Sequence, residues 1–548
     1  MLQACIENCG GISNITRVLV YQDQLIFEVK SADLIADYLR KHQFNSALSQ
    51  IRVERDKSVA DAQLAALGVV IKQEQLKALA NIEVKNGDTF RPNWHIAPPS
   101  GLLNDPNGFI HHDDHYHLFY QWNPFACEHK DKYWAHMTSK NLVDWDFQPV
   151  ALTPSDWFDS HGVFSGHAIS HNDQLIAFYT GNVRVGEQRD RLTSQCMAVS
   201  HDGIRFEKQG PVIPCLPEGV TPHCRDPKII KLGAKWLMLL GVQTEELQGR
   251  LAAYQSDDLR NWQFDKLYGE ELGDFGYMWE CPDLFELDGQ KFVVICPQGV
   301  KPDSTYHTVE HSNGYLKAEL SPEGELQLSD FQILDHGFDF YAPQTLETAD
   351  GRRVLSAWMG LPDEVNHPSV DNGWIHQITC LRELCQRDGK IIQQPVRELQ
   401  SLRGDAVSFN LNNGSYLPEN NSYELETELE LEWGTTLKLF KGSDQEVIIS
   451  FDSGLLKLNR SRTLTREGDR VRELALQSDK VKLRILADTS SLEIFINGGE
   501  YVMSSRVFVD PDACAISLDG KADFTLWPLN PASITSAQNS IELIKEGL

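Results

Sequence analysis

The N-terminal part of the chain combines two short strand-like runs with a longer helical pattern. In residues 15–29, ITRVLVYQDQLIFEV, two apolar runs flank a polar turn, which indicates two β-strands. From residue 31 to residue 80 apolar side chains recur at helical spacing, beginning with Leu34, Ile35, Tyr38 and Leu39. We therefore predict that residues 1–85 form a small α/β or helical extension. Its role, as a scaffold or a regulator, is left open by the pattern.

Residues 86–400 are rich in strand-like runs, and a motif repeats within them. The segments SKNLVDW, SHDGIRF and SDDLRNW share a serine, two polar residues, a turn and an aromatic residue. They begin at Ser139, Ser200 and Ser256, so the motif recurs at nearly constant intervals. A period of roughly 60 residues is the length that a propeller blade of four short strands requires.

A second series of positions follows the same period. It consists of Asp105, Ser165, Asp226, Glu280 and Tyr341, which are again nearly evenly spaced. Five positions in register predict a five-bladed β-propeller. Because the first strand of each blade lines the central axis, one residue from each blade can reach a common funnel. The series therefore predicts where a site would lie.

Residues 401–530 alternate apolar and polar side chains in short runs. One run leads through Leu492, Ile494 and Ile496 to Asn497-Gly498, a strong hairpin signal. No cluster of catalytic residue types occurs there, so we predict a structural β-sandwich followed by a short tail, residues 531–548. The expected fold class is all-β: a five-bladed propeller, then a sandwich, preceded by the small extension.

Charge and composition narrow the range of partners. The chain has 548 residues, with 50 Lys and Arg against 78 Asp and Glu, a formal charge of −28. Nucleic acids and anionic membrane surfaces require basic protein surface, so we expect neither as a partner. A small anionic substrate would need a local basic pocket. The oligomeric state is not indicated by the sequence.

The expected location is the cytoplasm. The N-terminus lacks a basic segment followed by an apolar run, and no stretch has the length of a membrane span. The 11 cysteines are odd in number and form no CxxC pair, which is typical of reduced thiols.

Three acidic residues of the second series stand in unusual settings: Asp105 in NDPNG, Asp226 in RDP and Glu280 in ECPD. A single Asp-Pro turn is usually structural, and an acid next to arginine is usually a salt-bridged strand end. Because the three acids occupy the same position in their repeats, we expect their side chains to converge on one site instead. Retaining cleavage of a glycosidic bond uses two carboxyl groups about 5 Å apart, one as nucleophile and one as acid and base.

These motifs resemble glycoside hydrolase family 32, the invertase family. HIAPPSGLLNDPNG, YQWNP, FSG, RDP, MWECPD, FYAPQ and RILADTSSLEIFINGGEYVMSSRVF match its motifs in order, over about three quarters of the chain. The resemblance implies a five-bladed propeller with a β-sandwich. It also implies that Asp105 is the nucleophile, Glu280 the general acid and base, and Asp226 the stabiliser of the transition state.

The same resemblance implies further site residues. Arg225 and Cys281 would tune Glu280, and we expect apolar neighbours such as Trp279 to raise the pKa of Glu280, as a general acid requires. The residues expected to line the sugar sites are Leu102, Leu103, Asn104, Gln121, Trp134, Phe164, Ser165, Arg225, Tyr341 and Trp374. For each aromatic residue the alternative is packing in the core, and for Trp374 the two interpretations are evenly balanced.

Departures from the usual invertase sequence bear on the substrate. Leu102-Leu103 replace a Trp-Met pair, and His129 replaces a tryptophan, with Lys130 and Lys132 close behind. This variant resembles family members that hydrolyse sucrose 6-phosphate, and we predict phosphate recognition by His129 and Lys132. The alternative is that the lysines lie on a solvated loop.

The predicted function is retaining hydrolysis of sucrose 6-phosphate, and of sucrose, through a fructosyl-enzyme. The alternatives are an intracellular invertase acting on sucrose or short fructans, a fructosyltransferase, and a non-catalytic sugar-binding propeller. Four histidines around Asp113-Asp114 suggest a metal site, but a hairpin turn explains them better. We expect neither a metal nor a cofactor, because carboxyl groups carry both catalytic steps.

Overall fold

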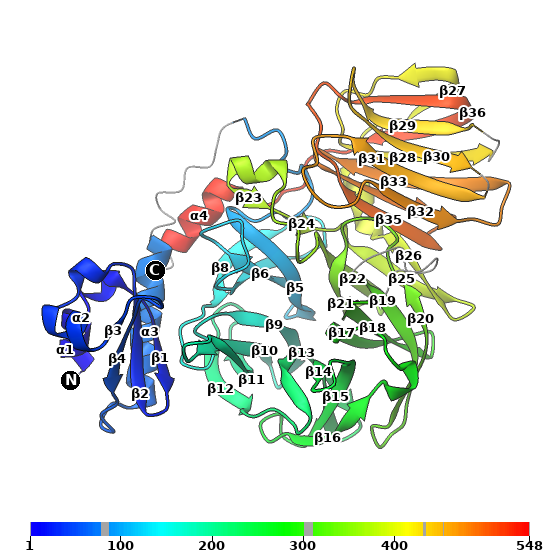
Figure 1. Ribbon diagram of the computed structural model, residues 1–548. Helices are drawn as coiled ribbons and strands as arrows, with labels where there is room; N and C mark the ends of the chain where they lie inside the picture. The colour runs from blue at the N-terminus through cyan, green and yellow to red at the C-terminus, as the bar shows by residue number, and fades with distance from the viewer. Residues whose placement is uncertain (1, 78–86, 301–310, 431–433, 453, 547–548) are drawn as a thin grey trace.

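The computed structural model describes residues 2–77, 87–300, 311–430, 434–452 and 454–546. Figure 1 shows a small α/β unit at the N-terminus, a ring of sheets in the middle and a β-sandwich after it. The C-terminal helix α4 (Ala537–Glu546) packs beside strand β8 (Asp146–Leu152) of the ring. The protein is thus an all-β propeller and sandwich with a small α/β extension, as the sequence predicted.

Five antiparallel sheets of four successive main strands form the propeller. The first strands of neighbouring blades pack against one another, so these strands surround the axis. In chain order the blades are β5 (Gly101–His112), β6 (His115–Asn123), β7 (Tyr133–Ser139), β8 (Asp146–Leu152); β9 (Val163–His171), β10 (Gln174–Val185), β11 (Asp190–Ser200), β12 (Glu207–Ile213); β13 (Val220–Leu232), β14 (Lys235–Thr244), β15 (Gly249–Ser256), β16 (Gln263–Tyr268); β17 (Met278–Leu287), β18 (Gln290–Gln298), β19 (Gly314–Leu320), β20 (Leu326–Ile333); and β21 (Tyr341–Glu347), β22 (Arg353–Met359), β25 (Arg382–Arg387), β26 (Lys390–Pro395).

Two short strands join the last blade to the first. Strand β23 (Trp374–Ile375) pairs in parallel with β5 of the first blade, and β24 (Gln377–Ile378) pairs with β22 of the fifth. One short stretch of chain therefore closes the ring. The pairing of β23 with β5 also covers part of the inner edge of the first blade, which would otherwise be open to pairing with other chains.

The inner strands are irregular where they carry the predicted site. In β5, β13, β17 and β21 the pairing register shifts beside the marked residue. The shifts in β13, β17 and β21 contain Pro227, Pro282 and Pro343, and the shift in β5 ends at Pro106. Proline has no N–H to donate, so it fits where the ladder is interrupted. Such bulges redirect neighbouring side chains, here toward the axis.

The repeated serine motif is the turn between the third and fourth strands of the first three blades. The Ser139 hydroxyl accepts a hydrogen bond from the Leu142 N–H at 2.9 Å, and Ser256 does the same for Leu259 at 3.0 Å. The fourth motif position is left-handed in all three turns, with φ of +63° at Leu142, +72° at Gly203 and +66° at Leu259. The motif therefore repeats because the turn repeats.

The sandwich contains ten strands: β27 (Val407–Tyr416), β28 (Tyr423–Glu430), β29 (Thr436–Lys441), β30 (Glu446–Asp452), β31 (Leu455–Arg462), β32 (Val471–Ala475), β33 (Lys480–Asp488), β34 (Ser491–Ile496), β35 (Tyr501–Arg506) and β36 (Ala515–Pro528). The long strand β36 pairs with β29 through its first half and with β28 through its second half. It therefore links the two halves of the sandwich. The predicted hairpin at Asn497-Gly498 joins β34 to β35.

The extension is an antiparallel sheet, β1 (Ile15–Tyr21), β2 (Gln24–Val29), β4 (Gln50–Glu54) and β3 (Phe44–Asn45), with helices α1 (Leu2–Asn8), α2 (Asp37–His42) and α3 (Asp61–Leu76). The prediction of two strands in residues 15–29 is confirmed. The helical prediction for residues 31–80 is wrong at β3 and β4, because Ile51 is buried by pairing with β2, a contact distant in sequence. The end of that range, residues 78–80, lies outside the described residues.

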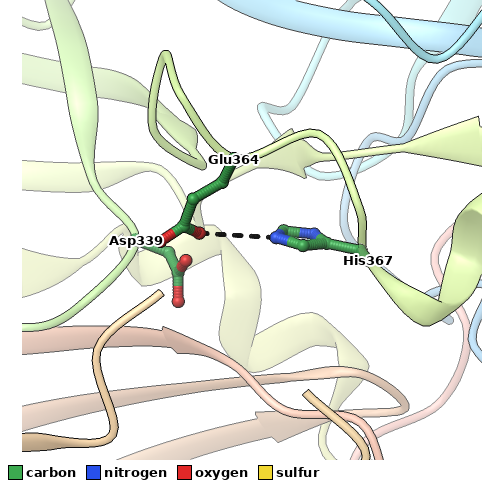
Figure 2. A group of neighbouring side chains, drawn as sticks. All are labelled: Asp339, Glu364 and His367. Carbon is green, nitrogen blue, oxygen red and sulfur yellow. Dashed lines mark hydrogen bonds and ion pairs between the residues drawn. The ribbon is translucent and has the colours of Figure 1, made fainter. Parts of the chain in front are cut away.

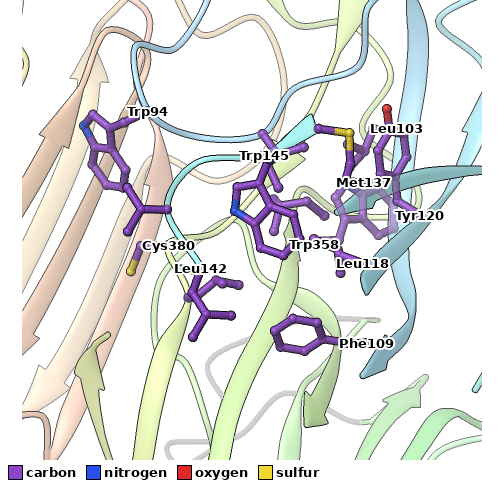
Figure 3. Packing of buried hydrophobic residues seen from close by; sticks show 14 of the residues in the cluster. Trp94, Leu103, Phe109, Leu118, Tyr120, Met137, Leu142, Trp145, Trp358 and Cys380 are labelled. Carbon is purple, nitrogen blue, oxygen red and sulfur yellow. The ribbon is translucent and has the colours of Figure 1, made fainter. Parts of the chain in front are cut away.

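The largest apolar core joins the two ends of the propeller to the sandwich. Figure 3 shows Leu103, Trp145 and Trp358 in this cluster, from the first and fifth blades. Phe495 and Val502 of the sandwich belong to the same cluster. An apolar cluster therefore spans the contact between propeller and sandwich, while the interior of the sandwich forms a separate cluster.

Candidate active site

A cavity of about 700 Å³ lies where the inner strands meet. Four members of the periodic series line this cavity: Asp105, Asp226, Glu280 and Tyr341. The fifth, Ser165, is buried beside Asp105 and donates a hydrogen bond to its carboxylate. The periodic positions thus converge, as a propeller requires.

Asp105 lies in a network of neutral donors. Ser165 Oγ donates to Asp105 Oδ2, and Asn104 Nδ2 lies 3.2 Å from Oδ1. Gln121 accepts from Asn104 at 2.9 Å and donates to Ser165. Burial, and secondarily the charge of Glu280, raise the pKa of Asp105, while the hydrogen bond from Ser165 opposes this. These contacts fix the carboxylate in one orientation.

Asp226 is close enough to Asp105 and Glu280 for the charges of both to act on it. Its Oδ2 accepts from the Cys281 N–H at 2.9 Å and lies 4.0 Å from Arg225 Nε. The Cys281 thiol approaches Asp226 at 3.6 Å and Asp105 at 3.7 Å. Burial, opposed by Arg225 and reinforced by the two neighbouring acids, raises the pKa of Asp226 to about 7. The expectation that Cys281 tunes Glu280 is corrected, because its thiol contacts the two aspartates.

Glu280 is held by charged and neutral donors. Arg225 Nε donates to Oε1 at 3.0 Å, while Tyr341 OH and Gln298 Nε2 donate to Oε2 at 2.6 and 2.7 Å. Burial acts to raise the pKa of Glu280, but the charge of Arg225 and the donated hydrogen bonds together hold it below its ordinary value.

The expected raised pKa of Glu280 is therefore wrong, because the pKa is held below its ordinary value. Trp279, the neighbour expected to raise it, points away into the core between the third and fourth blades. Its indole N–H donates to Phe275 O at 2.6 Å, and its ring packs against Gly249 and Gly269. Alternation along β17 explains this, because neighbouring residues of a strand face opposite sides.

His129 and Lys132 lie on the Asp105 side of the cavity. Lys132 Nζ donates to Asn104 Oδ1 at 2.7 Å and lies 2.9 Å from His129 Nδ1. Burial lowers the pKa of Lys132 to about 7, and burial with the charge of Lys132 puts the pKa of His129 well below its ordinary value. Lys130, in contrast, is largely exposed and paired with Glu128 at 2.6 Å.

Four residues expected at the sugar sites do not line the cavity: Leu102, Leu103, Trp134 and Trp374 are fully buried elsewhere. Leu103 belongs to the large core, and the Trp134 indole donates to Phe164 O at 3.1 Å. Trp374 donates to Asp88 Oδ2 at 2.6 Å, with Arg91 stacked 4.7 Å from its ring. Of the two interpretations of Trp374, the core interpretation fits the structure. Phe164, Asn104, Gln121 and Arg225 do line the cavity.

Sequence reasoning missed a group of arginines at the cavity. Arg184, Arg189 and Arg191 belong to the β10–β11 hairpin, and Arg17 comes from β1 of the extension. The segment RVGEQRDR, with its three arginines, was the available signal in an otherwise acidic chain. No sequence signal indicates Arg17, because it reaches the site only through the packing of the extension. Gln298 and Trp358 were also missed.

A separate cluster brings together Asp339, Glu364 and His367 near the sandwich (Figure 2). These are metal-ligand types, but Arg460 pairs with Asp339 and already supplies positive charge there. Burial raises the pKa of both acids. The pairing with Arg460 and the raised pKa values are typical of a cluster of carboxyl groups with a structural role. The histidines near Asp113-Asp114 flank a two-residue hairpin turn with φ of +48° and +60°, as predicted.

The inner strands of the propeller bring three carboxyl groups to one cavity. This arrangement defines the class of the protein: it is a glycoside hydrolase. The chain belongs to glycosyl hydrolases family 32, whose N-terminal domain model matches residues 95–395 and whose C-terminal model matches residues 394–528.

Named relatives of this chain include two sucrose-6-phosphate hydrolases. It is 53% identical to the probable sucrose-6-phosphate hydrolase of Psychromonas ingrahamii, over 97% of this chain and 99% of the relative. It is 41% identical to the sucrose-6-phosphate hydrolase of Bacillus subtilis, over 81% and 95%.

Solved structures give the same fold. The sucrose-6-phosphate hydrolase from Lactobacillus gasseri aligns with a TM-score of 0.77 at 30% identity, covering 87% of this chain and 98% of that one. The Bombyx mori GH32 beta-fructofuranosidase aligns with a TM-score of 0.75 at 33% identity, covering 84% and 99%. Among the described residues, no helix combines the length and apolarity needed to cross a membrane.

Proposed function

We propose that this protein hydrolyses the β-fructofuranosidic bond of sucrose 6-phosphate, and more slowly that of sucrose, with retention of configuration. The observation that carries the proposal is the convergence of Asp105, Asp226 and Glu280 on one cavity that also has an arginine-rich wall. The names of the relatives support the phosphorylated substrate. We place the reaction in the cytoplasm, where a phosphorylated sugar is retained.

The geometry supports a role for each carboxyl group. Asp105 attacks the anomeric carbon of the fructosyl unit, and the bond to the bridging oxygen breaks as Glu280 donates a proton to that oxygen. Glucose 6-phosphate leaves. Glu280 then takes a proton from water, the water oxygen bonds to the anomeric carbon, and the ester to Asp105 breaks to release fructose. Asp226 holds fructose hydroxyls during both steps.

The proton for the first step belongs to the carboxyl cluster as a whole. Because the pKa of Asp226 is raised to about 7, the cluster of carboxyl groups keeps one proton below that pH. Glu280 needs that proton when the leaving sugar is bound. Ordered contacts from Arg225 and Tyr341 keep Glu280 in place for both its acid and its base role.

The test is kcat/KM for sucrose 6-phosphate and for sucrose, measured side by side on the purified protein. We expect the phosphorylated sugar to be preferred by about 100-fold, because two charge-assisted phosphate contacts supply this difference. Equal or better use of sucrose would contradict the proposed substrate and favour an invertase. Absence of hydrolysis of either sugar would contradict the enzyme mechanism itself.

A further inference from the structure

The β10–β11 hairpin carries two arginines directly opposite each other. Arg184 and Arg191 form a cross-strand pair in the antiparallel ladder, and both line the cavity. Like charges in directly opposed positions destabilise a hairpin, so the placement of these two arginines lowers its stability. A bound anion between them would remove that destabilisation.

Neither arginine has an acidic partner. Among the described residues, no carboxylate oxygen lies within the 4.0 Å ion-pair distance of either guanidinium. Arg191 Nε is buried and no described group accepts a hydrogen bond from it. Its guanidinium lies 5.6 Å from the Phe164 ring, a second cavity residue. Burial, with the charges of Arg225 and Arg184, lowers the pKa of Arg191 to about 9, so an anionic ligand would be favoured there.

Arg191, with Arg184 opposite it on the hairpin, lies toward Glu280, beside which the leaving sugar must bind. Glu280 protonates the oxygen of the leaving group, and the charges of Arg225 and Glu280 both act on Arg191. Lys132, in contrast, donates to Asn104, which contacts the nucleophile Asp105 on the fructose side. Neutral His129 offers no cationic donor.

We propose that Arg184 and Arg191 form the subsite for the phosphate monoester on the leaving sugar, in place of His129 and Lys132. Two guanidinium groups from paired positions on one wall of the cavity suit the planar, bidentate recognition of phosphate. This inference rests on the proposed function, because it assigns the phosphate of the same substrate.

The test compares the ratio of kcat/KM for sucrose 6-phosphate to kcat/KM for sucrose in Arg184→Gln, Arg191→Gln and the double variant. We expect the ratio to fall about 100-fold in the double variant. The matched control is Arg205→Gln in the same blade, whose side chain is 84% exposed. Its ratio should equal that of the wild type.

The outcomes separate the two proposals. If the wild type shows no preference for the phosphorylated sugar, the proposed function fails. If it does but the double variant keeps the preference, the arginine subsite is wrong. Inorganic phosphate gives a second measurement: it should raise the thermal midpoint of the wild type and not that of the double variant. Equal shifts in both proteins would also overturn the subsite.

A different set of contacts assigns a role to the N-terminal extension. Arg17 of β1 donates to Ser160 O at 3.0 Å and pairs with both Glu28 and Asp131, the residue before Lys132. Lys72 of α3 lies 3.5 Å from the same Asp131 carboxylate. Leu19 and Ile26 of the extension pack on Val183 and Val185, which flank Arg184.

We infer that the extension is a positioning element that holds two walls of the cavity, the loop at residues 128–132 and the β10–β11 hairpin. Arg17→Met should raise KM for sucrose 6-phosphate about 10-fold with little change in kcat, and Arg17→Lys should recover part of the loss. Arg55→Met, which removes an ion pair with Asp61 within the extension, is the control. An unchanged KM in Arg17→Met, with only a lower thermal midpoint, would overturn the inference.

Discussion

At the scale of single residues, the site depends on how three acids share protons. Arg225 and Tyr341 favour the ionised form of Glu280, and burial favours the neutral form of Asp226. The proton that serves the general acid step is therefore held by the cluster, and the cluster titrates as a unit. This differs from the sequence-based expectation of a single acid whose pKa is raised by apolar neighbours.

The pH profile of kcat/KM should be bell-shaped. As pH rises past about 7, the pKa to which Asp226 is raised, the cluster loses its proton and the rate falls. As pH falls, Asp105, whose pKa is also raised, becomes protonated and can no longer attack. Rates measured across the acidic and alkaline ranges check this, and a rate that rises steadily into alkali would contradict it.

Asp226→Asn should move the alkaline limb to lower pH. Removing a neighbouring negative charge lowers the pKa of the remaining acids, so the cluster loses its proton earlier. We also expect kcat to fall by roughly 10²–10³-fold, because contacts to the transition state are lost. An alkaline limb at the wild-type position would show that Asp226 takes no part in the shared titration.

At the scale of elements, the regular spacing of the series predicted the position of the site because each inner strand begins one blade. The period alone places Asp105, Glu280 and Tyr341 at the axis, where all three line the cavity. Trp374 and Arg17 could not be placed in this way. Their environments depend on β23 closing the ring and on the extension packing against the first two blades, which are contacts distant in sequence.

The third and fourth blades approach at Gly241 on β14. A Cβ at this position would lie 1.8 Å from the Trp279 backbone oxygen on β17. Gly241→Ala should therefore reduce the free energy of unfolding by about 1–3 kcal/mol or more, measured by denaturant titration. Gly414→Ala, where the nearest atom is at 3.9 Å, should stay within about 0.5 kcal/mol of the wild type. Equal stability of both variants would argue against this close approach.

At the scale of the whole molecule, propeller and sandwich are joined by buried charges as well as by apolar side chains. Arg382 of the fifth blade pairs with Glu493 of the sandwich at 2.7 Å, and with Asp335, which follows strand β20, at 3.0 Å. All three side chains are fully buried. His95, ahead of the first blade, contacts Glu493 and Asp488 of the sandwich. The net charge of −28 describes the whole chain, whereas the arginines of the cavity give this one region the opposite sign.

Arg382→Met should destabilise the protein by about 3–5 kcal/mol, because two buried carboxylates lose the guanidinium that pairs with both. The control is Arg397→Met, which breaks a pair whose arginine is 59% exposed and should cost at most about 1 kcal/mol. Thermal unfolding followed by circular dichroism compares the two. Similar midpoints for both variants would mean that Arg382 does not hold the two parts together.

The central claim is that Asp105 is the nucleophile of a fructosyl hydrolase, and kcat of Asp105→Asn tests it most directly. The asparagine keeps the size of the side chain and its contact with Ser165, so the variant should fold with a thermal midpoint close to that of the wild type. On sucrose 6-phosphate, or on sucrose if that is the better substrate, we predict a loss of kcat on the order of 10⁴-fold or more. A folded variant that keeps kcat within about 10-fold of the wild type would contradict the account.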